Sequence, residues 1–310
     1  MIPIFIGGCC RSGTTFLGSM LGSHSKCICT PESQFKIEML NNYYQLKKDD
    51  LLSVFRTIKD NFRFKIWGIN IEPDINEGIW SSYSELIMWI VQKYSEINNK
   101  KGPKFWIDHT ASNIKYATVL FNLFHNAKMV HIIRDGRAVA SSVIPLDWGP
   151  NTIENAAHWW LGDLSYGFAA ESFFKSNQII RVKYEDLVIN PETTLKTLCT
   201  FLDIEYEPDM VKGNGFKVPE FTVNQHCYVG KKPNTKRIDS WKRELTSRQI
   251  EIFESLTYDI LTYLGYDLMY GLKANPPSFI ERKIFMIVDF YRKQTNKIVF
   301  RNRVNKHTKN

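Results

Sequence analysis

A glycine-rich loop between a buried strand and a helix is the feature that most constrains the fold of this chain. Residues 7–15 (GGCCRSGTT) follow the apolar run 2–6 and lead into residues 14–21, which have helical character. This order of elements aims unpaired backbone N–H groups and the positive end of a helix dipole at a bound anion. The sequence therefore predicts a phosphate-binding loop at the end of the first strand.

The loop lacks the lysine of a loop that binds nucleoside triphosphates. The spacing from Gly8 to Gly13 and Thr15 fits the Walker A pattern, but Thr14 stands where that lysine would reach the β- and γ-phosphates. This difference disfavours an ordinary nucleoside triphosphatase and weakens the alternative of a P-loop kinase. Taken alone, the segment also fits a glycine-rich turn with no ligand.

Composition indicates a globular chain with a basic end. At 310 residues and 44% hydrophobic content, the chain can bury a full core, and we expect one α/β domain. Residues 273–310 contain ten Lys or Arg against Glu281 and Asp289, and this surplus equals the net charge of +8. Such a basic end attracts polyanions or anionic lipid, or forms a solvated face.

The sequence shows no transmembrane, signal or metal-binding pattern. No uncharged apolar run reaches the length of about 18 residues that a membrane span needs, and no signal peptide is visible. We expect a cytoplasmic protein, with a peripheral membrane location left open. The six cysteines form no CxxC pair and no zinc-spaced cluster with histidine, so we expect reduced thiols and no metal site.

Strand and helix patterns alternate along the chain. The expected strands are residues 2–6, 26–29, 104–107, 128–133 and 178–182. The expected helices are residues 14–21, 50–61, 82–97, 112–124, 136–143, 152–174, 191–202 and 246–264. This alternation predicts a parallel sheet covered on both faces, with ligands beyond the carboxyl ends of its strands. Residues 213–240 read as a long loop, which in a compact domain is usually functional.

A second candidate anion site follows the strand predicted at residues 128–133. Arg134 stands at the end of this strand, and the helix after it carries Ser142. A guanidinium at a strand end suits a phosphate, which it can bind through two hydrogen bonds. Alone, residues 134–137 (RDGR) also fit an exposed turn with a local ion pair. Together with the first loop, they predict two separate anion sites.

These motifs resemble those of sulfotransferases that use 3′-phosphoadenosine-5′-phosphosulfate (PAPS). The loop is most similar to that of the group containing the tyrosylprotein sulfotransferases and many bacterial relatives, and the resemblance covers most of residues 1–270. It implies a P-loop NTPase-like three-layer fold with a central parallel sheet flanked by helices. It also implies in-line transfer of a sulfuryl group from PAPS to a hydroxyl of a saccharide, a lipid-linked acceptor or a peptidyl tyrosine. Backbone dipoles and arginines can offset the charge, so no metal is required.

The resemblance implies a set of residues that bind the co-substrate. Arg11 would stabilise charge on the sulfonate and the leaving phosphate. The 5′-phosphate would be held by the loop residues Ser12, Gly13, Thr14 and Thr15. In the family, an arginine and a serine eight residues later hold the 3′-phosphate, and the matching positions here are Arg134 and Ser142.

Two later segments extend this set. Tyr184, in a Tyr-Glu-Asp-Leu segment, matches a tyrosine that lies near the nucleotide in the family, although the segment also fits a purely structural helix start. Ahead of Trp241, a basic residue would contact the 3′-phosphate; Arg237 is the first choice and Lys236 the second. Relatives carry a lysine directly before this tryptophan, whereas this chain has Ser240.

A hydroxyl acceptor needs a general base within hydrogen-bond reach. Glu32 follows the second predicted strand, and its offset from Arg11 equals that of the catalytic glutamate from the loop arginine in the tyrosylprotein sulfotransferases. The alternative is a glutamate favoured by a helix dipole in the first turn of a helix.

His109 is the second catalytic candidate. Relatives carry a lysine at this point, and that lysine reaches the sulfuryl group. A histidine can donate or accept a proton near neutral pH, so a sulfonate donor, a base or neither role is open. We rank the donor role first.

The remaining segments are assigned by elimination. Residues 35–97 match no co-substrate motif, so we expect an acceptor-recognition insertion there within a domain of residues 1–270. Residues 271–310 form a basic amphipathic extension that fits an anionic membrane surface, a second subunit or packing on the domain. We expect packing up to Tyr291 and a solvated or membrane-touching end beyond it.

Two alternatives from other classes stay open. A non-catalytic nucleotide-binding regulator would bind adenosine 3′,5′-bisphosphate without transferring sulfate. A nucleic-acid-binding protein would use the basic end, but the sequence carries no nucleic-acid-binding fold signature, and we expect no specific nucleic acid partner.

Overall fold

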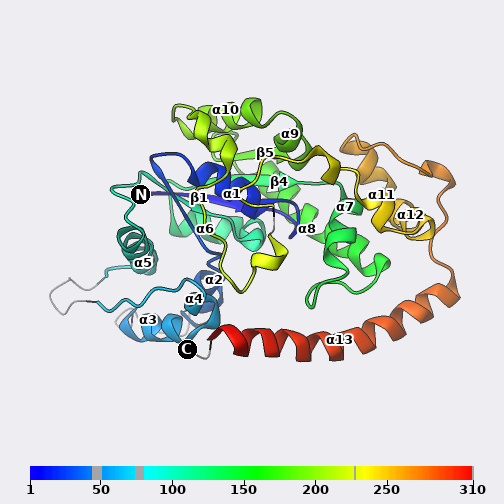
Figure 1. The fold of residues 1–310 in the computed structure, drawn as a ribbon, viewed down its shortest axis with the longest axis horizontal. Coiled ribbons are helices and arrows are strands. Elements are labelled where there is room, and N and C mark those ends of the chain that lie inside the picture. Colours follow the sequence, from blue (N-terminus) through cyan, green and yellow to red (C-terminus); the bar gives the residue numbers. More distant parts are fainter. Residues whose placement is uncertain (44–50, 74–79, 227, 309–310) are drawn as a thin grey trace.

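A central sheet organises the molecule. The computed structural model describes residues 1–43, 51–73, 80–226 and 228–308. Five parallel strands lie in the order β2-β3-β1-β4-β5. They are β1 Ile2–Gly7, β2 Cys27–Thr30, β3 Phe105–Asp108, β4 Lys128–Ile133 and β5 Ile179–Lys183. Helices flank the sheet on both faces (Figure 1), so the predicted α/β fold is confirmed.

The helices follow the predicted pattern with a few additions. The α-helices are α1 Thr14–Gly22, α2 Phe35–Tyr43, α3 Leu51–Asp60, α4 Phe62–Lys65, α5 Tyr83–Ile97, α6 Ala117–Leu123, α7 Gly136–Val143, α8 Ile153–Phe173, α9 Tyr184–Ile189, α10 Pro191–Leu202, α11 Trp241–Glu244, α12 Ser247–Tyr263 and α13 Phe279–Thr308. The helix expected over residues 112–124 begins instead as a 3-10 turn, Ala111–Tyr116. There the side chain of Asn113 donates to the carbonyls of Ile6 and Asp108 and holds the turn against β1.

Both faces of the sheet are buried, which is why its strands read as continuous apolar runs. Successive strand residues point to opposite faces. On one face, Ile4 and Ile6 pack in a cluster with Leu17 of α1. On the other, Phe5 packs edge-on against Trp106, with ring centroids 5.7 Å apart. The carboxyl ends of the strands therefore meet at one edge, where the loops are free to form a site.

The basic extension forms one long helix, α13. Figure 1 shows α13 along the lower edge of the molecule, from beside α12 to beside α3 and α4. We expected packing up to Tyr291 and solvation beyond it, and this division is wrong. Ile280 and Ile287 are exposed, whereas Arg292 and Arg303 donate hydrogen bonds to the segment between α7 and α8. Within the described ranges, no helix combines the length and apolarity that crossing a bilayer requires.

Candidate functional site

The glycine-rich loop connects β1 to α1 in a conformation that depends on glycine. Gly13 precedes the first residue of α1 and has a φ of 99°. A Cβ atom on Gly13 would lie 2.5 Å from Cδ2 of Tyr184, so a side chain would collide with that ring as well as strain the backbone. The loop therefore brings the N-terminus of α1 close to Tyr184, with room for an anion at the helix end.

Most of the predicted co-substrate residues line one cavity of about 290 Å³, which we call the arginine cavity. The predicted residues in its wall are Arg11, Gly13, Thr14, Thr15, Arg134, Ser142, Tyr184 and Arg237. Ser12 is fully buried and lies outside this wall, and its Oγ has no hydrogen-bond partner among the described residues. Lys236 is exposed and also lies outside it. The geometry thus favours Arg237 over Lys236.

Arg134 and Arg11 belong to the same site, although 123 residues separate them. Arg134 is 5% exposed, and its Nη1 donates to the carbonyl of Arg11 at 2.9 Å. Its Nη2 donates to the carbonyl of Arg237 at 3.3 Å, and its guanidinium lies 4.4 Å from the ring centroid of Tyr184. The Nε of Arg134 is buried and has no partner in the part of the chain that the structure describes. A donor of this kind is available to an anion in the cavity.

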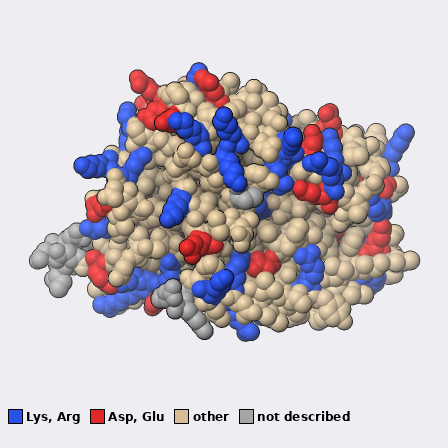
Figure 2. Space-filling model, viewed as in Figure 1, with Lys and Arg blue, Asp and Glu red and all other residues tan. Residues whose placement is uncertain are grey.

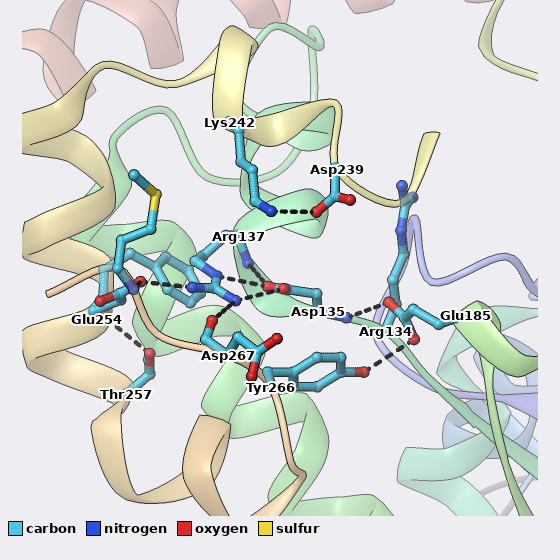
Figure 3. Close-up of polar contacts among 12 residues, drawn as sticks. Arg134, Asp135, Arg137, Glu185, Asp239, Lys242, Glu254, Thr257, Tyr266 and Asp267 are labelled. Carbon is cyan, nitrogen blue, oxygen red and sulfur yellow. Dashed lines mark hydrogen bonds and ion pairs between the residues drawn. The ribbon is translucent and has the colours of Figure 1, made fainter. Parts of the chain in front are cut away.

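A buried polar network supports the strand end that carries Arg134 (Figure 3). The backbone N–H of Asp135 donates to Glu185 at 3.0 Å, and Tyr266 donates to the same carboxylate at 3.1 Å. Burial raises the pKa of Glu185, although its hydrogen bond from Asp135 partly opposes this shift. Arg137 does not line the arginine cavity and pairs with Asp135 at 2.8 Å and with Glu254 at 2.5 Å. The second basic residue of the RDGR turn is therefore structural.

A second cavity, of about 250 Å³, adjoins the first, and we call it the carboxylate cavity. Residues in the walls of both cavities are Arg11, Thr14, Thr15, Gln225 and His226. The carboxylate cavity is also lined by Glu32, Arg63, Trp148, Phe221, Phe300 and Arg303. The loop arginine thus stands at the border between an arginine-lined cavity and one that holds an acidic side chain.

Glu32 is held on the segment after β2 and faces the carboxylate cavity. One carboxylate oxygen accepts a hydrogen bond from Gln34 at 3.1 Å and lies 3.9 Å from Nη1 of Arg63. The carbonyl of Glu32 accepts from the indole N–H of Trp67 at 3.2 Å. These contacts hold Glu32 in place, and its side chain is 29% exposed and lines the cavity. The geometry allows Glu32 to accept a proton from a bound molecule.

A buried ion pair lies next to the segment that carries Glu32. Lys36 contacts Asp108 at 2.7 Å, and both side chains are at most 1% exposed. Ser33 donates to Asp108 at 2.6 Å, which ties the segment after β2 to the end of β3. Burial alone raises the pKa of Asp108, but the charge of Lys36 and the hydrogen bonds lower it overall. Asp108 therefore stays ionised and rigidly placed beside His109.

His109 lies beneath the loop rather than in either of the two cavities. Its Nδ1 is 3.3 Å from Oγ1 of Thr15, and its ring packs against Phe216 with centroids 4.8 Å apart. Burial lowers its pKa, so the ring is neutral near pH 7. A third, smaller space of about 30 Å³ is lined by His109, Glu32 and Thr15. The structure thus brings His109 near the predicted base, with Thr15 as its polar contact.

Sequence reasoning missed several cavity residues on the long loop. The carbonyl of Gln225 accepts from Arg11 at 2.8 Å, and its side chain accepts from Trp148 at 3.2 Å. His226 lies beside these groups, and burial together with the charge of Arg11 lowers its pKa to about 3. The only sequence signal was that residues 213–240 form a functional loop, which did not identify these members.

The far wall of the carboxylate cavity comes from α13. Arg303 donates to both carboxylate oxygens of Asp147, at 3.0 and 2.8 Å. Its guanidinium lies 4.5 Å from the ring centroid of Phe221 and 5.3 Å from that of Phe300. Asp147 holds the guanidinium of Arg303, and this guanidinium in turn packs on the rings of Phe221 and Phe300. Arg303 therefore helps to position the aromatic wall of the cavity. From residues 35–97, where we expected acceptor recognition, only Arg63 lines this cavity among the described residues.

Cys10 lines the carboxylate cavity, but its thiol is not reactive. Burial raises the pKa of Cys10 to about 12, so this thiol in the carboxylate cavity is not poised as a nucleophile. Among the residues with described positions, no group of three His, Cys, Asp or Glu side chains could hold a metal ion.

Comparisons with known proteins agree with this geometry. A family model described as "Sulfotransferase family" matches residues 3–208. Protein-tyrosine sulfotransferase A of Caenorhabditis elegans is 26% identical over 285 residues, covering 89% of this chain and 69% of its own length. The Drosophila melanogaster protein-tyrosine sulfotransferase is 25% identical over 289 residues, and the chain spans only 53% of its length.

Solved structures show the same fold. The sulfotransferase domain of the Synechococcus PCC 7002 olefin synthase aligns with a TM-score of 0.58 at 21% identity, covering 86% of this chain and 95% of that domain. The sulfotransferase domain from the curacin biosynthetic pathway aligns with a TM-score of 0.55 at 20% identity, over 86% and 98%.

Proposed function

The chain belongs to the sulfotransferase family, and we propose that it binds PAPS in the arginine cavity and a hydroxyl-bearing acceptor in the carboxylate cavity. The observation that carries this proposal is the shared border: Arg11, Thr14 and Thr15 line both cavities. A group transferred between two ligands must pass through such a border.

The arginine cavity suits a doubly phosphorylated nucleotide. The N-terminus of α1 can receive the 5′-phosphate through backbone N–H groups and the hydroxyls of Thr14 and Thr15. The unpartnered Nε of Arg134 suits the 3′-phosphate, with Ser142 and Arg237 in the same wall. Arg11 donates to Ser142 at 3.0 Å, and this hydrogen bond links the two proposed anion sites.

In this proposal PAPS supplies a sulfuryl group that is already activated by its bond to phosphate. The acceptor oxygen forms a bond to sulfur while the bond between sulfur and the phosphate oxygen breaks, leaving adenosine 3′,5′-bisphosphate. Arg11 stabilises the negative charge on the sulfonate and on the leaving phosphate. The proton of the acceptor hydroxyl goes to the carboxylate of Glu32.

Glu32 is our choice of base because of where its carboxylate lies. It faces the carboxylate cavity, and the loop arginine stands in the same wall. Nη1 of Arg63 lies 3.9 Å from a carboxylate oxygen of Glu32, and both residues line the carboxylate cavity.

His109 remains a candidate for contact with the sulfonate, and its geometry supports an indirect part. Its Nδ1 contacts Thr15, so it can orient the hydroxyl that faces the 5′-phosphate. A neutral buried ring suits this task better than proton exchange with solvent.

The wall of the carboxylate cavity favours a phenolic acceptor. Trp148, Phe221 and Phe300 give it an aromatic lining, onto which a phenol ring can pack. The relatives named protein-tyrosine sulfotransferases point the same way, so a peptidyl tyrosine is our first acceptor. A saccharide or a lipid-linked hydroxyl is second.

Two measurements test this function. Thermal unfolding with adenosine 3′,5′-bisphosphate, ATP, ADP and AMP is expected to show the largest stabilisation with the bisphosphate. Transfer of labelled sulfate from PAPS is then measured with a tyrosine peptide, a small phenol and a saccharide. Bisphosphate preference without any sulfated product would indicate a nucleotide-binding regulator, and preference for ATP would indicate a kinase.

A further inference from the structure

Helix α13 presents its polar side chains to the protein, which is the reverse of an ordinary surface helix. A surface helix normally buries an apolar stripe against the core. Here Arg292 donates to the carbonyls of Ile144 and Asn151, and Asn296 donates to Asn151. Hydrogen bonds and ion pairs therefore hold much of the inward face of α13 against the domain. Phe285 and Phe300 are the aromatic residues on this inward face.

The opposite side of α13 carries a row of large apolar side chains. Its members, each more than half exposed, are Ile280, Ile284, Ile287, Phe290, Tyr291 and Ile298. Their spacing is mostly three or four residues, so they share one side of the helix. A contiguous apolar surface of this kind marks an interaction site. We call it the outer face.

The exposed charged residues in the described part of α13 are all cations. They are Arg282, Lys283, Lys293, Lys297, Arg301 and Lys306. The two acidic residues, Glu281 and Asp289, are half-buried and pair with Arg248 and Lys293. Figure 2 shows mainly uncharged side chains with scattered Lys and Arg along the edge that α13 occupies.

We propose that the outer face of α13 docks onto an anionic lipid bilayer, with the helix lying flat on the surface. The apolar row would enter the boundary between headgroups and acyl chains, while Lys283, Lys297 and Arg301 meet lipid phosphates. At about 1.5 Å per residue, the 30 residues offer a contact roughly 45 Å long. A second copy of this chain fits less well, because two faces whose exposed charges are all positive repel each other.

The test is co-sedimentation of the full chain with vesicles. One set is phosphatidylcholine alone, and the other is equal parts phosphatidylcholine and phosphatidylserine. The full chain is expected to bind the second set and to leave the first largely unbound, with binding that weakens as salt rises.

Two variants separate the apolar and the charge contributions. Ile287→Ser with Phe290→Ser is expected to abolish binding. Replacing Lys283, Lys297 and Arg301 by Gln is expected to lower partitioning about a hundredfold, since each cation near the surface contributes roughly fivefold. All of these side chains are exposed, so the unfolding temperature should not change.

Phe173→Ser is the matched control. Phe173 is 77% exposed but lies at the end of α8, and its variant should bind vesicles like the original chain. The proposal is overturned if the original chain binds neither vesicle, or if the Ile287 and Phe290 variant binds as well as the original. A dimer in sedimentation velocity that this variant dissociates, without any vesicle binding, would assign the face to a second copy.

Discussion

The two cavities of this molecule are built in different ways. The arginine cavity takes Arg11, Arg134 and Tyr184 from the segments that follow β1, β4 and β5, and residues of the long loop complete its wall. The carboxylate cavity draws its wall from α4, the long loop and α13, which lie far apart along the chain. The order of strands in the parallel sheet brings together Arg11, Arg134 and Tyr184 of the first cavity, whereas tertiary contacts between distant segments bring together the aromatic wall of the second.

This difference teaches which part of the reaction the fold itself fixes. In our proposal, backbone N–H groups and guanidinium groups at the sheet edge bind the co-substrate, whatever the acceptor is. In the same proposal, the aromatic wall binds the acceptor, and a substitution there has little effect on nucleotide binding. Substitutions in the two cavities should therefore have separable effects.

The largest effect is expected from substitution of the proposed general base, Glu32. Glu32→Gln should lower turnover with the best acceptor about 100- to 10,000-fold, because the amide cannot take the acceptor proton. Binding of adenosine 3′,5′-bisphosphate, measured by titration calorimetry, should stay within about twofold. Turnover within a few-fold of the original in a folded variant would show that Glu32 is not the base.

A selective loss of nucleotide binding is expected from Arg134→Gln. Affinity for adenosine 3′,5′-bisphosphate should fall about 10- to 100-fold, because a hydrogen bond to a charged group is lost. Affinity for AMP, which has no 3′-phosphate, should fall much less, and this smaller loss reflects the bonds of Arg134 to the carbonyls of Arg11 and Arg237. Lys242→Gln, which removes an exposed cation paired with Asp239, serves as the control. An equal loss for both nucleotides would remove Arg134 from the 3′-phosphate site.

The aromatic wall should affect only the acceptor. Phe300→Ala is expected to raise the acceptor KM about two- to tenfold, the range of one aromatic contact, with bisphosphate binding unchanged. Val299→Ala, at the neighbouring exposed position, should leave KM as it is. If the two variants give the same KM, Phe300 has no part in acceptor binding.

The smallest effect concerns His226, which borders both cavities. Its pKa of about 3 lies below the ordinary value of 6.5. Between these two pH values, the histidine is protonated in the unfolded chain and neutral in the folded chain. Stability is therefore present above pH 6.5 and is lost as the pH falls towards 3. Between pH 6.5 and 5.5, the original chain should lose about 1 kcal/mol more than His226→Asn.

In a thermal scan, this difference corresponds to about 2 °C in Tm. Bound bisphosphate should reduce it, because the nucleotide offsets the charge of Arg11. Parallel pH curves for the two proteins would mean that His226 titrates normally in the fold.

The sequence predicted the sheet and the arginine cavity better than the carboxylate cavity, for a physical reason. Local pattern determines β1, the loop and α1, and the position of Arg134 follows from the end of a recognisable strand. The prediction of one helix over residues 112–124 was partly wrong. The hydrogen bonds from Asn113 to the carbonyls of Ile6 and Asp108 hold its first residues in a 3-10 turn, and a local sequence pattern does not reveal such tertiary bonds.

The prediction for α13 was wrong because its contacts with the domain are largely polar. Apolar residues up to Tyr291 are typical of packing on a domain, yet the polar residues Arg292 and Arg303 make the contacts. Their acceptors include Asp147 and backbone carbonyls on the segment after α7, which no local pattern relates to α13. Phe300 and His226 could not be assigned to a cavity for the same reason.

The position of Phe300 on α13 separates one side of the proposed acceptor wall from the loop at the start of the chain. The family model matches residues 3–208, so Phe300 lies outside the matched segment. If our proposal holds, exchanging α13 for another helix would change the selected hydroxyl while Arg11, Arg134 and Tyr184 keep their places.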